Sequence, residues 1–109
     1  MRPPNPLRAL AESVNAEDTE GFLDSFADDA LVDDDGHRYR GLLQIAEWNT
    51  RQVIGVHVRV RTLTDDPAGD EGAVAAELVV DGREHRCRIS ATWHEHRIQH
   101  LQVRSADPA

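Results

Sequence analysis

The stretch VIGVHVRVRTL at residues 53–63 holds the change of pattern that decides the fold. Before Gly55, apolar residues recur at spacings of three and four, which is typical of an amphipathic helix. From Val56 to Arg61, apolar and polar residues alternate one by one, which is typical of a strand with one buried face. The chain is therefore predicted to change from helices to strands at this point.

The alternation continues toward the C-terminus in runs that are separated by turn residues. The expected strands are residues 56–64, 73–80, 84–94 and 98–103. The expected connections are a hairpin loop at residues 65–70, a turn at Asp81-Gly82 and a turn at Glu95-His96. Asp-Gly is a favoured hairpin turn, and strands joined by such turns pair in antiparallel fashion. Residues 56–103 are therefore predicted to form a four-stranded antiparallel meander.

Toward the N-terminus, the chain is predicted to hold three helices and two short strands. The helices are expected from Leu7 to Asn15, from the N-cap pair Asp18-Thr19 to Asp28-Asp29, and from Gly41 to Gly55. The short strands are expected at Ala30–Val32 and His37–Arg40, with a turn at Asp35-Gly36. Three helices on one side of a mainly antiparallel sheet make an α+β fold. A sheet that curves over them in a cone-like shape leaves a concave space, where small-molecule pockets form.

The 109 residues are enough for one domain. Residues 1–6, which include three prolines, are expected to be a disordered lead-in. The domain is expected to span residues 7–104, and residues 105–109 are expected to be a tail. The single cysteine, Cys87, excludes a disulfide framework.

The net charge of −8 argues against two classes of partner. Such a chain repels the phosphates of nucleic acids and the surface of anionic membranes, so neither is an expected partner. The sequence has no apolar run of membrane-spanning length and no signal-like start, so a cytoplasmic location is expected. It has no nucleotide or phosphate-binding motif, so no cofactor is expected.

The segment FADDALVDD at residues 26–34 carries a resemblance to a known family. Together with the order of elements, it resembles the nuclear-transport-factor-2-like superfamily, in particular its SnoaL-like and ketosteroid-isomerase-like branch. The other residues that carry the resemblance are Asn15–Asp18, Tyr39–Gly41, Ile45, Trp48 and Arg97-Ile98. The resemblance spans Leu7 to Val103. It implies the cone-like fold but no single activity, because one scaffold serves many chemistries.

The resemblance also implies a role for Asp34. In ketosteroid isomerases an aspartate at this position shuttles a proton. Those enzymes also have a tyrosine donor where this chain has Leu10, and a neutral aspartic acid near the position of Ile89. Because both donors are missing, steroid isomerisation is not expected here.

Asp34 is a candidate general base on its own pattern as well. In a strand it shares one face with Ala30 and Val32, so it is expected to point into the apolar pocket, where a carboxylate suits acid–base work. The alternative is a solvated acid within the run from Asp33 to Asp35. His57 lies on the polar face by strict alternation. A bulge after Gly55 would turn it toward Asp34 as a proton relay, and the alternative is an exposed or interface histidine.

Aromatic side chains are the candidate substrate-binding groups. They are Phe22, Phe26, Tyr39, Trp48 and Trp93. They suit a flat or lipophilic ligand, although a place in the core is the favoured interpretation of the two phenylalanines. Tyr39 is also a candidate hydroxyl donor. The cluster of His94, His96 and His100 invites a metal interpretation, but it falls at a hairpin tip and no metal site is expected.

The polar face of the sheet is expected to pair two copies of the chain. It carries Arg59, Arg61, Glu77, Arg86, Arg88, Ser90 and Thr92. Proteins of the resembled family commonly dimerise through this face, and an arginine-rich surface opposite an acidic front half is a plausible interface. A homodimer is therefore expected.

These observations lead to two hypotheses about function. The first is cofactor-independent acid–base catalysis with Asp34 as proton shuttle, by a cyclase, isomerase or dehydratase acting on a polyketide-like or terpenoid-like small molecule. The second is a non-catalytic ligand-binding or dimerisation module on the same scaffold. An inward Asp34 beside a donor favours the first hypothesis, whereas a pocket filled by its own side chains favours the second.

Overall fold

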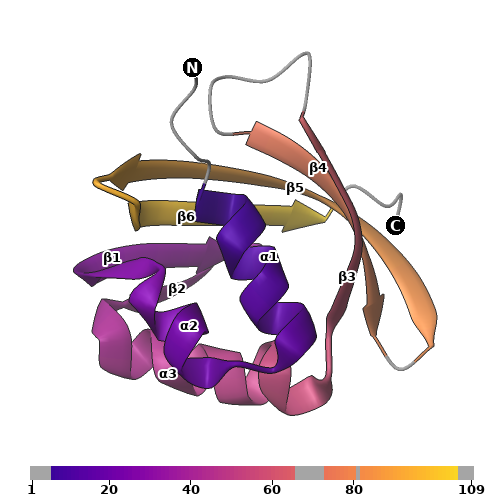
Figure 1. The fold of residues 1–109 in the computed structure, drawn as a ribbon, viewed down its shortest axis with the longest axis horizontal. Coiled ribbons are helices and arrows are strands. Elements are labelled where there is room, and N and C mark those ends of the chain that lie inside the picture. Colours follow the sequence, from indigo (N-terminus) through magenta and orange to yellow (C-terminus); the bar gives the residue numbers. More distant parts are fainter. Residues whose placement is uncertain (1–5, 66–72, 81, 106–109) are drawn as a thin grey trace.

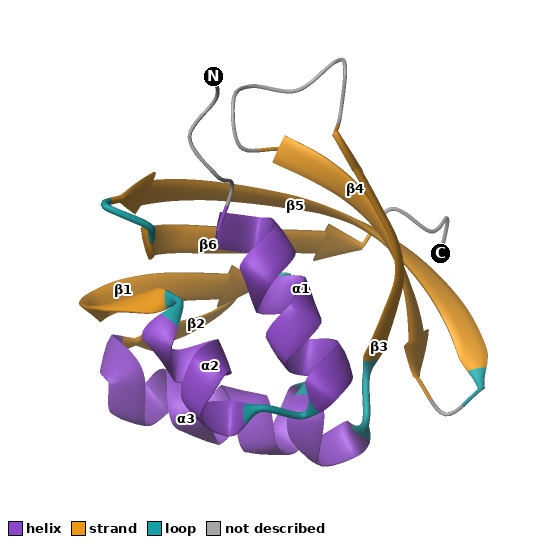
Figure 2. Ribbon diagram, in the orientation of Figure 1, coloured by secondary structure: helices purple, strands orange, loops and turns teal. Residues whose placement is uncertain are grey.

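Three helices pack on one face of a curved six-stranded sheet (Figures 1 and 2). The structure, a computed structural model, describes residues 6–65, 73–80 and 82–105. The helices are α1 (Pro6–Ala16), α2 (Thr19–Asp24), α3 (Gly41–Gln52) and the short 3-10 helix η1 (Ile54–Val56). The strands are β1 (Phe26–Asp34), β2 (His37–Arg40), β3 (Arg59–Asp65), β4 (Ala73–Val80), β5 (Arg83–His94) and β6 (Arg97–Ser105). The predicted α+β class is confirmed.

The sheet has the strand order β2-β1-β6-β5-β4-β3. The pairs from β3 to β6 are all antiparallel, which confirms the predicted four-stranded meander. The first half of the chain joins it through a parallel pair, β1 with β6, in which Val32 lies beside Leu101. This parallel pair places the end of β1 at the concave face that the helices cover.

Strand β1 is longer than the sequence pattern indicated. The second helix ends at Asp24, and Phe26, predicted to be helical, is the first residue of β1. Phe26 pairs with Ile98 of β6, and the Ile98 N–H donates to the Ser25 carbonyl at 2.8 Å. Phe22 and Phe26 are four residues apart, which fits one face of a helix, but a strand buries Phe26 equally well. The two rings remain in contact, with centroids 5.4 Å apart.

The junction between helices and strands is a tight turn rather than the start of a strand. The 3-10 helix η1 follows α3, and His57 then adopts a left-handed conformation with φ of 58°. Gly55 is required here, because a Cβ would lie 1.6 Å from the Thr50 carbonyl oxygen. Strand β3 therefore begins at Arg59, three residues after the predicted start, although Val58 is buried as the alternation predicted.

Helix α1 is tied to the edge strand β3 by one side chain. Asn15 accepts a hydrogen bond from the Val60 N–H at 2.7 Å and donates one to the Val60 carbonyl at 3.0 Å. An amide thereby satisfies the backbone groups that an edge strand leaves unpaired. Arg59 adds a hydrogen bond to the Asn15 carbonyl. These contacts hold α1 across the concave face, where it forms one side of the interior.

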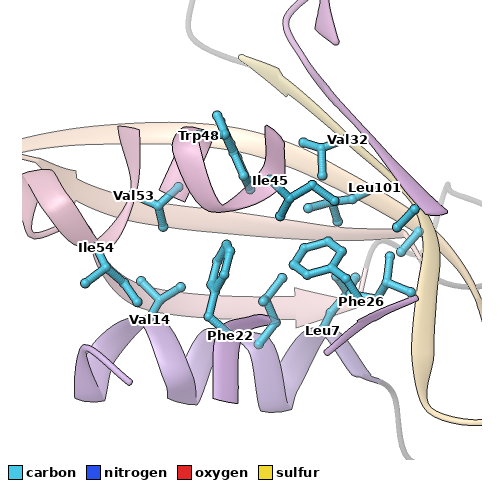
Figure 3. Packing of buried hydrophobic residues seen from close by; sticks show 14 of the residues in the cluster. Leu7, Val14, Phe22, Phe26, Val32, Ile45, Trp48, Val53, Ile54 and Leu101 are labelled. Carbon is cyan, nitrogen blue, oxygen red and sulfur yellow. The ribbon is translucent and has the colours of Figure 1, made fainter. Parts of the chain in front are cut away.

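The core lies between the helices and the concave face of the sheet (Figure 3). Its most deeply buried members include Phe22, Phe26, Ile45, Ile98 and Leu101, each no more than 2% exposed. None of the described helices is long and apolar enough to cross a membrane.

Some boundary predictions fall at the limits of the described residues. The lead-in before Pro6, most of the 65–70 loop, Asp81 and the tail after Ser105 lie outside them. Pro6 itself is the first residue of α1, where its missing N–H costs nothing, and Ser105 is the last residue of β6.

Candidate ligand site

A cavity of about 140 Å³ lies inside the cone, between the helices and the sheet. Most of its wall is aliphatic. The helix side chains are Leu7, Leu10, Ala11 and Val14 of α1, and the sheet side chains are Val58, Val60, Leu78, Ile89, Leu101 and Val103. Phe22, Asp34, Trp48, Gln52 and Val53 complete the wall. The sheet residues are the inward members of the alternating runs, so the pattern that shapes the strands also makes the cavity apolar.

Asp34 is the one carboxylate among the described wall residues. It is half-buried at the end of β1, and its Oδ2 accepts a hydrogen bond from the Trp48 indole N–H at 2.9 Å. In the described part of the chain, the Asp34 carboxylate makes no other hydrogen bond. The predicted inward direction of Asp34 is therefore the observed one, and a neutral donor holds one of its two oxygens.

The neighbouring aspartates have different surroundings. Asp33 points to the other side of the sheet, where Arg104 binds both of its oxygens, at 2.9 and 3.3 Å, and the Gly36 N–H donates at 2.8 Å. The Arg104 hydrogen bonds, followed by the Gly36 N–H, lower the pKa of Asp33 to about 2. Asp35 accepts from the Ser105 N–H at 2.9 Å in the turn after β1. The run of three acids thus contains one residue that faces the cavity.

Two of the five candidate aromatic residues line the cavity. Phe22 and Trp48 face the same space from different helices, with ring centroids 5.9 Å apart (Figure 3). The structure does not place Phe26, Tyr39 or Trp93 on this wall. Phe26 is buried in the core, where its ring packs against that of Phe22.

Tyr39 and Trp93 are partly buried and pack against the core from outside the cavity. The centroid of the Tyr39 ring lies 6.0 Å from that of Trp48. Tyr39 is on β2, which is the edge strand on that side of the sheet, and it does not reach the cavity. Trp93 lies near the β5–β6 hairpin, opposite Ile98. Period-two alternation predicts which face a residue takes but not how far along the sheet it lies from the cavity.

His57 is not brought to Asp34. Its side chain is 73% exposed, and Nδ1 lies 3.2 Å from both carboxylate oxygens of Glu17. The left-handed turn after η1 directs the ring outward toward the end of α1, where Arg59 also binds Glu17. The predicted relay between His57 and Asp34 is therefore wrong, and the alternative of an exposed histidine is the observed one.

The sequence analysis overlooked Gln52 as a site residue. Gln52 lies one helical turn after Trp48 in α3 and lines the cavity while remaining exposed. Its amide makes no hydrogen bond within the described residues. The signal was available, because residues four apart share one face of a helix. Leu10 and Ile89, where the resembled isomerases have their donors, are both on the wall, so the cavity is aliphatic at those positions.

The histidines near the β5–β6 hairpin lie away from the cavity wall. The turn at Glu95-His96 is present, and both residues have positive φ angles. His94 and Glu95 are exposed, with Nε2 and Oε1 3.8 Å apart. The described residues contain no group of three His, Cys, Asp or Glu side chains arranged to hold a metal ion.

Solved structures with the same arrangement identify the class of fold. A proposed polyketide cyclase from Sinorhizobium meliloti aligns with a TM-score of 0.74 and 24% identity over 94% of this chain and 95% of that one. An NTF-2-like protein from Burkholderia xenovorans aligns at 0.69 with 19% identity over 95% and 82%. A Mycobacterium tuberculosis protein in complex with estradiol-17beta-hemisuccinate aligns at 0.67 with 18% identity over 90% and 88%.

The chain therefore has the nuclear-transport-factor-2-like fold, which confirms the predicted resemblance at the level of the fold. Comparison of the sequence with family models and with curated proteins finds no match.

Proposed function

We propose that this protein carries out cofactor-independent acid–base chemistry on a small organic molecule, with Asp34 as the group that accepts and returns the proton. One observation carries the proposal: a carboxylate, held through one oxygen by Trp48, stands on the wall of an otherwise largely aliphatic cavity. A polyketide-like or terpenoid-like substrate suits such a wall. The similarity in fold to a proposed polyketide cyclase and to a protein with a bound steroid ester supports this class of ligand.

The chemistry follows from the surroundings of Asp34. The carboxylate removes a proton from a carbon next to a carbonyl group, and the C–H electron pair moves to the carbonyl oxygen. Return of the proton to the far carbon of a conjugated C=C bond gives isomerisation. Attack of the enolate carbon on a second carbonyl carbon of the same molecule, whose oxygen then takes the proton back from Asp34, gives cyclisation. The Trp48 N–H fixes the orientation of the carboxylate. The aliphatic wall limits competing hydration.

A non-catalytic binding protein is the second candidate function. The observation that favours it is the aliphatic character of the wall at Leu10 and Ile89, since the reaction needs a donor for the developing oxyanion. In this case Asp34 anchors a ligand hydroxyl group and no proton is transferred from carbon.

Deuterium exchange distinguishes the two functions without knowledge of the natural substrate. The protein is incubated in D₂O with cyclohexanone, and loss of the protons next to the carbonyl is followed by NMR. We expect the protein to accelerate exchange and Asp34→Asn to reduce that acceleration at least ~10²-fold. Asp35→Asn is the matched control and should keep the activity. If cyclohexanone binds but its exchange is not accelerated, the catalytic proposal is wrong and the binding function stands.

We also propose that two copies pair through the face of the sheet opposite the helices. No described helix covers this face (Figure 2). Arg88 and Ser90 of β5 are predicted to lie on it, whereas Arg59, predicted to share this face, instead reaches the end of α1, where it binds the Asn15 carbonyl and Glu17.

This face holds charges of both signs: Arg61 pairs with Glu84, and Glu77 lies opposite Arg86. A two-fold axis can set the positive groups of one copy against the negative groups of the other.

A further inference from the structure

We infer that Gln52 is a second catalytic residue of the cavity, whose amide N–H donates a hydrogen bond to the substrate carbonyl oxygen while Asp34 removes a proton from the neighbouring carbon. The inference rests on the proposed function, because it uses the same cavity and the same carboxylate. It supplies from helix α3 the donor that the wall lacks at Leu10 and Ile89. It also sets the direction in which the substrate lies.

Proton removal by Asp34 requires a donor for the oxygen of the substrate. The C–H bond breaks, its electron pair forms the C=C bond of an enolate, and the carbonyl π pair moves to the oxygen, where negative charge develops. In a largely aliphatic cavity this charge is unfavourable unless a hydrogen bond meets it. A neutral amide donates that bond and keeps its own proton, so the proton that returns to the product is the one held by Asp34.

Gln52 is the donor that the described part of the wall leaves available. The polar side chains of this wall are those of Asp34, Trp48 and Gln52. The Trp48 N–H already donates to Asp34 at 2.9 Å, and an ionised carboxylate can only accept. The Gln52 amide makes no hydrogen bond to another described residue. Its N–H groups are therefore the ones that a substrate oxygen can meet.

The spacing along α3 suits a base and a donor that act on one carbonyl group. Trp48 holds the carboxylate at its own level of the helix, and Gln52 follows one turn later, about 5–6 Å away between Cβ atoms. Long helical side chains favour rotamers that lean toward the N-terminus of the helix, which for Gln52 is the direction of Trp48. The base and the donor each need a contact of about 3 Å, to two atoms that one carbon separates. A spacing of one helical turn meets this requirement.

The exposure of Gln52 sets the direction of the substrate. Because Gln52 is exposed as well as part of the wall, it lies where the cavity opens to solvent. The carbonyl group therefore lies at this opening, and a hydrocarbon part of the substrate packs inside against aliphatic residues such as Leu10 and Leu101. A substrate larger than the cavity extends outward past Gln52. Since water also reaches the opening, Gln52 should contribute less than a donor enclosed in the core.

The test removes the donor and keeps the length of the side chain. Gln52→Met has no N–H group, and the deuterium exchange of cyclohexanone is followed over a range of concentrations. We expect the rate at saturation to fall about tenfold, the loss of one hydrogen bond. The dissociation constant should change by less than about twofold, because the hydrogen bond strengthens only as charge develops on the oxygen. Arg51→Met is the matched control on the same turn of α3, exposed and outside the wall, and should keep both values.

Infrared spectroscopy measures the hydrogen bond without relying on turnover. A hydrogen bond to a carbonyl oxygen weakens the C=O bond and lowers its stretching frequency. For cyclohexanone bound in H₂O, we expect a lower frequency in the unaltered protein and in Arg51→Met than in Gln52→Met. A residue that only supports the end of α3 would leave this frequency unchanged. The melting temperature of Gln52→Met checks that the variant is folded.

The outcomes separate the inference from the function on which it rests. If Asp34→Asn abolishes the acceleration while Gln52→Met keeps the full rate at saturation, the role of Gln52 is wrong and the proposed function stands. The same holds if Gln52→Met weakens binding alone or leaves the carbonyl frequency unchanged. If the unaltered protein binds cyclohexanone and does not accelerate its exchange, the proposed function and the inference fail together.

Discussion

The two faces of the sheet at the end of β1 hold adjacent aspartates in opposite situations. On the outer face, Asp33 is only 6% exposed, and it is bound through both oxygens by the cation Arg104. On the inner face, Asp34 is bound through one oxygen by the neutral Trp48 and faces an aliphatic cavity. A carboxylate whose two oxygens are both bound by a cation stabilises the fold. A carboxylate with an uncommitted oxygen beside a cavity is available for a ligand or a proton.

The largest expected effect comes from replacing each of the two aspartates in turn by asparagine, which carries no charge. Asp34→Asn should lower the deuterium exchange of cyclohexanone at least ~10²-fold with little change in melting temperature, since asparagine can still accept from Trp48. Asp33→Asn should lower the melting temperature and leave the exchange rate within about twofold of the original. Calorimetry and the NMR exchange assay together measure both effects. A reversal of the two results would contradict the assignment of roles to the two faces.

The donor that holds Asp34 is expected to matter less than Asp34 itself. Trp48→Phe keeps an aromatic ring on the wall but removes the N–H, so the carboxylate loses its orientation. We expect the exchange rate at saturating cyclohexanone to fall about tenfold. The dissociation constant of cyclohexanone should change less than the rate does. A rate equal to that of the original chain would mean that the hydrogen bond between Trp48 and Asp34 does not position the base.

The outer face of the sheet, which the helices do not cover, is expected to form the dimer interface. Arg88→Glu adds negative charge to a face on which Glu77 and Glu84 already lie, so two copies should repel each other. Sedimentation should give a dimer for the original chain and a dissociation constant several-fold weaker for the variant. Asp34→Asn, on the inner face, should leave the assembly unchanged. A chain that sediments as a monomer at micromolar concentration excludes the dimer, and a dimer unaffected by Arg88→Glu excludes this surface.

The smallest expected effect is the pH dependence that Asp33 adds to stability. Its pKa is about 2 in the folded protein, below the roughly 3.9 of an aspartate in an unfolded chain. The unfolded state therefore takes up the proton first as the pH falls. The contribution of the Asp33 charge is complete above about pH 4 and is lost as the pH falls toward 2.

Urea unfolding at several pH values measures this effect. Asp33→Asn should be less stable than the original chain at pH 5, and the difference should shrink steadily between pH 4 and pH 2. Asp35→Asn serves as a control on the same turn. A difference that is constant with pH would show that the Arg104 pair is not the source of the stabilisation.

The sequence alone determined the features that depend on which side of an element faces the core. The alternation through β3, β4, β5 and β6 predicted the meander, and the alternation from Ala30 through Val32 predicted that Asp34 points inward. The helical spacing before Gly55 likewise predicted α3 and the inward face that carries Trp48. These patterns are readable because the period of an element sets its buried face before any partner is known.

Only the tertiary structure decided which segments meet. Backbone hydrogen bonds between strands do not depend on residue type, so the sequence did not predict the parallel pairing of β1 with β6. For the same reason it did not predict that Phe26 belongs to a strand rather than to a helix. The position of a residue along a strand, rather than its face, placed Trp93 outside the cavity wall. The turn at His57 directs that histidine to Glu17, the residue after α1, and away from Asp34. Contacts between distant segments arise from the packing of the whole domain, which local periodicity does not encode.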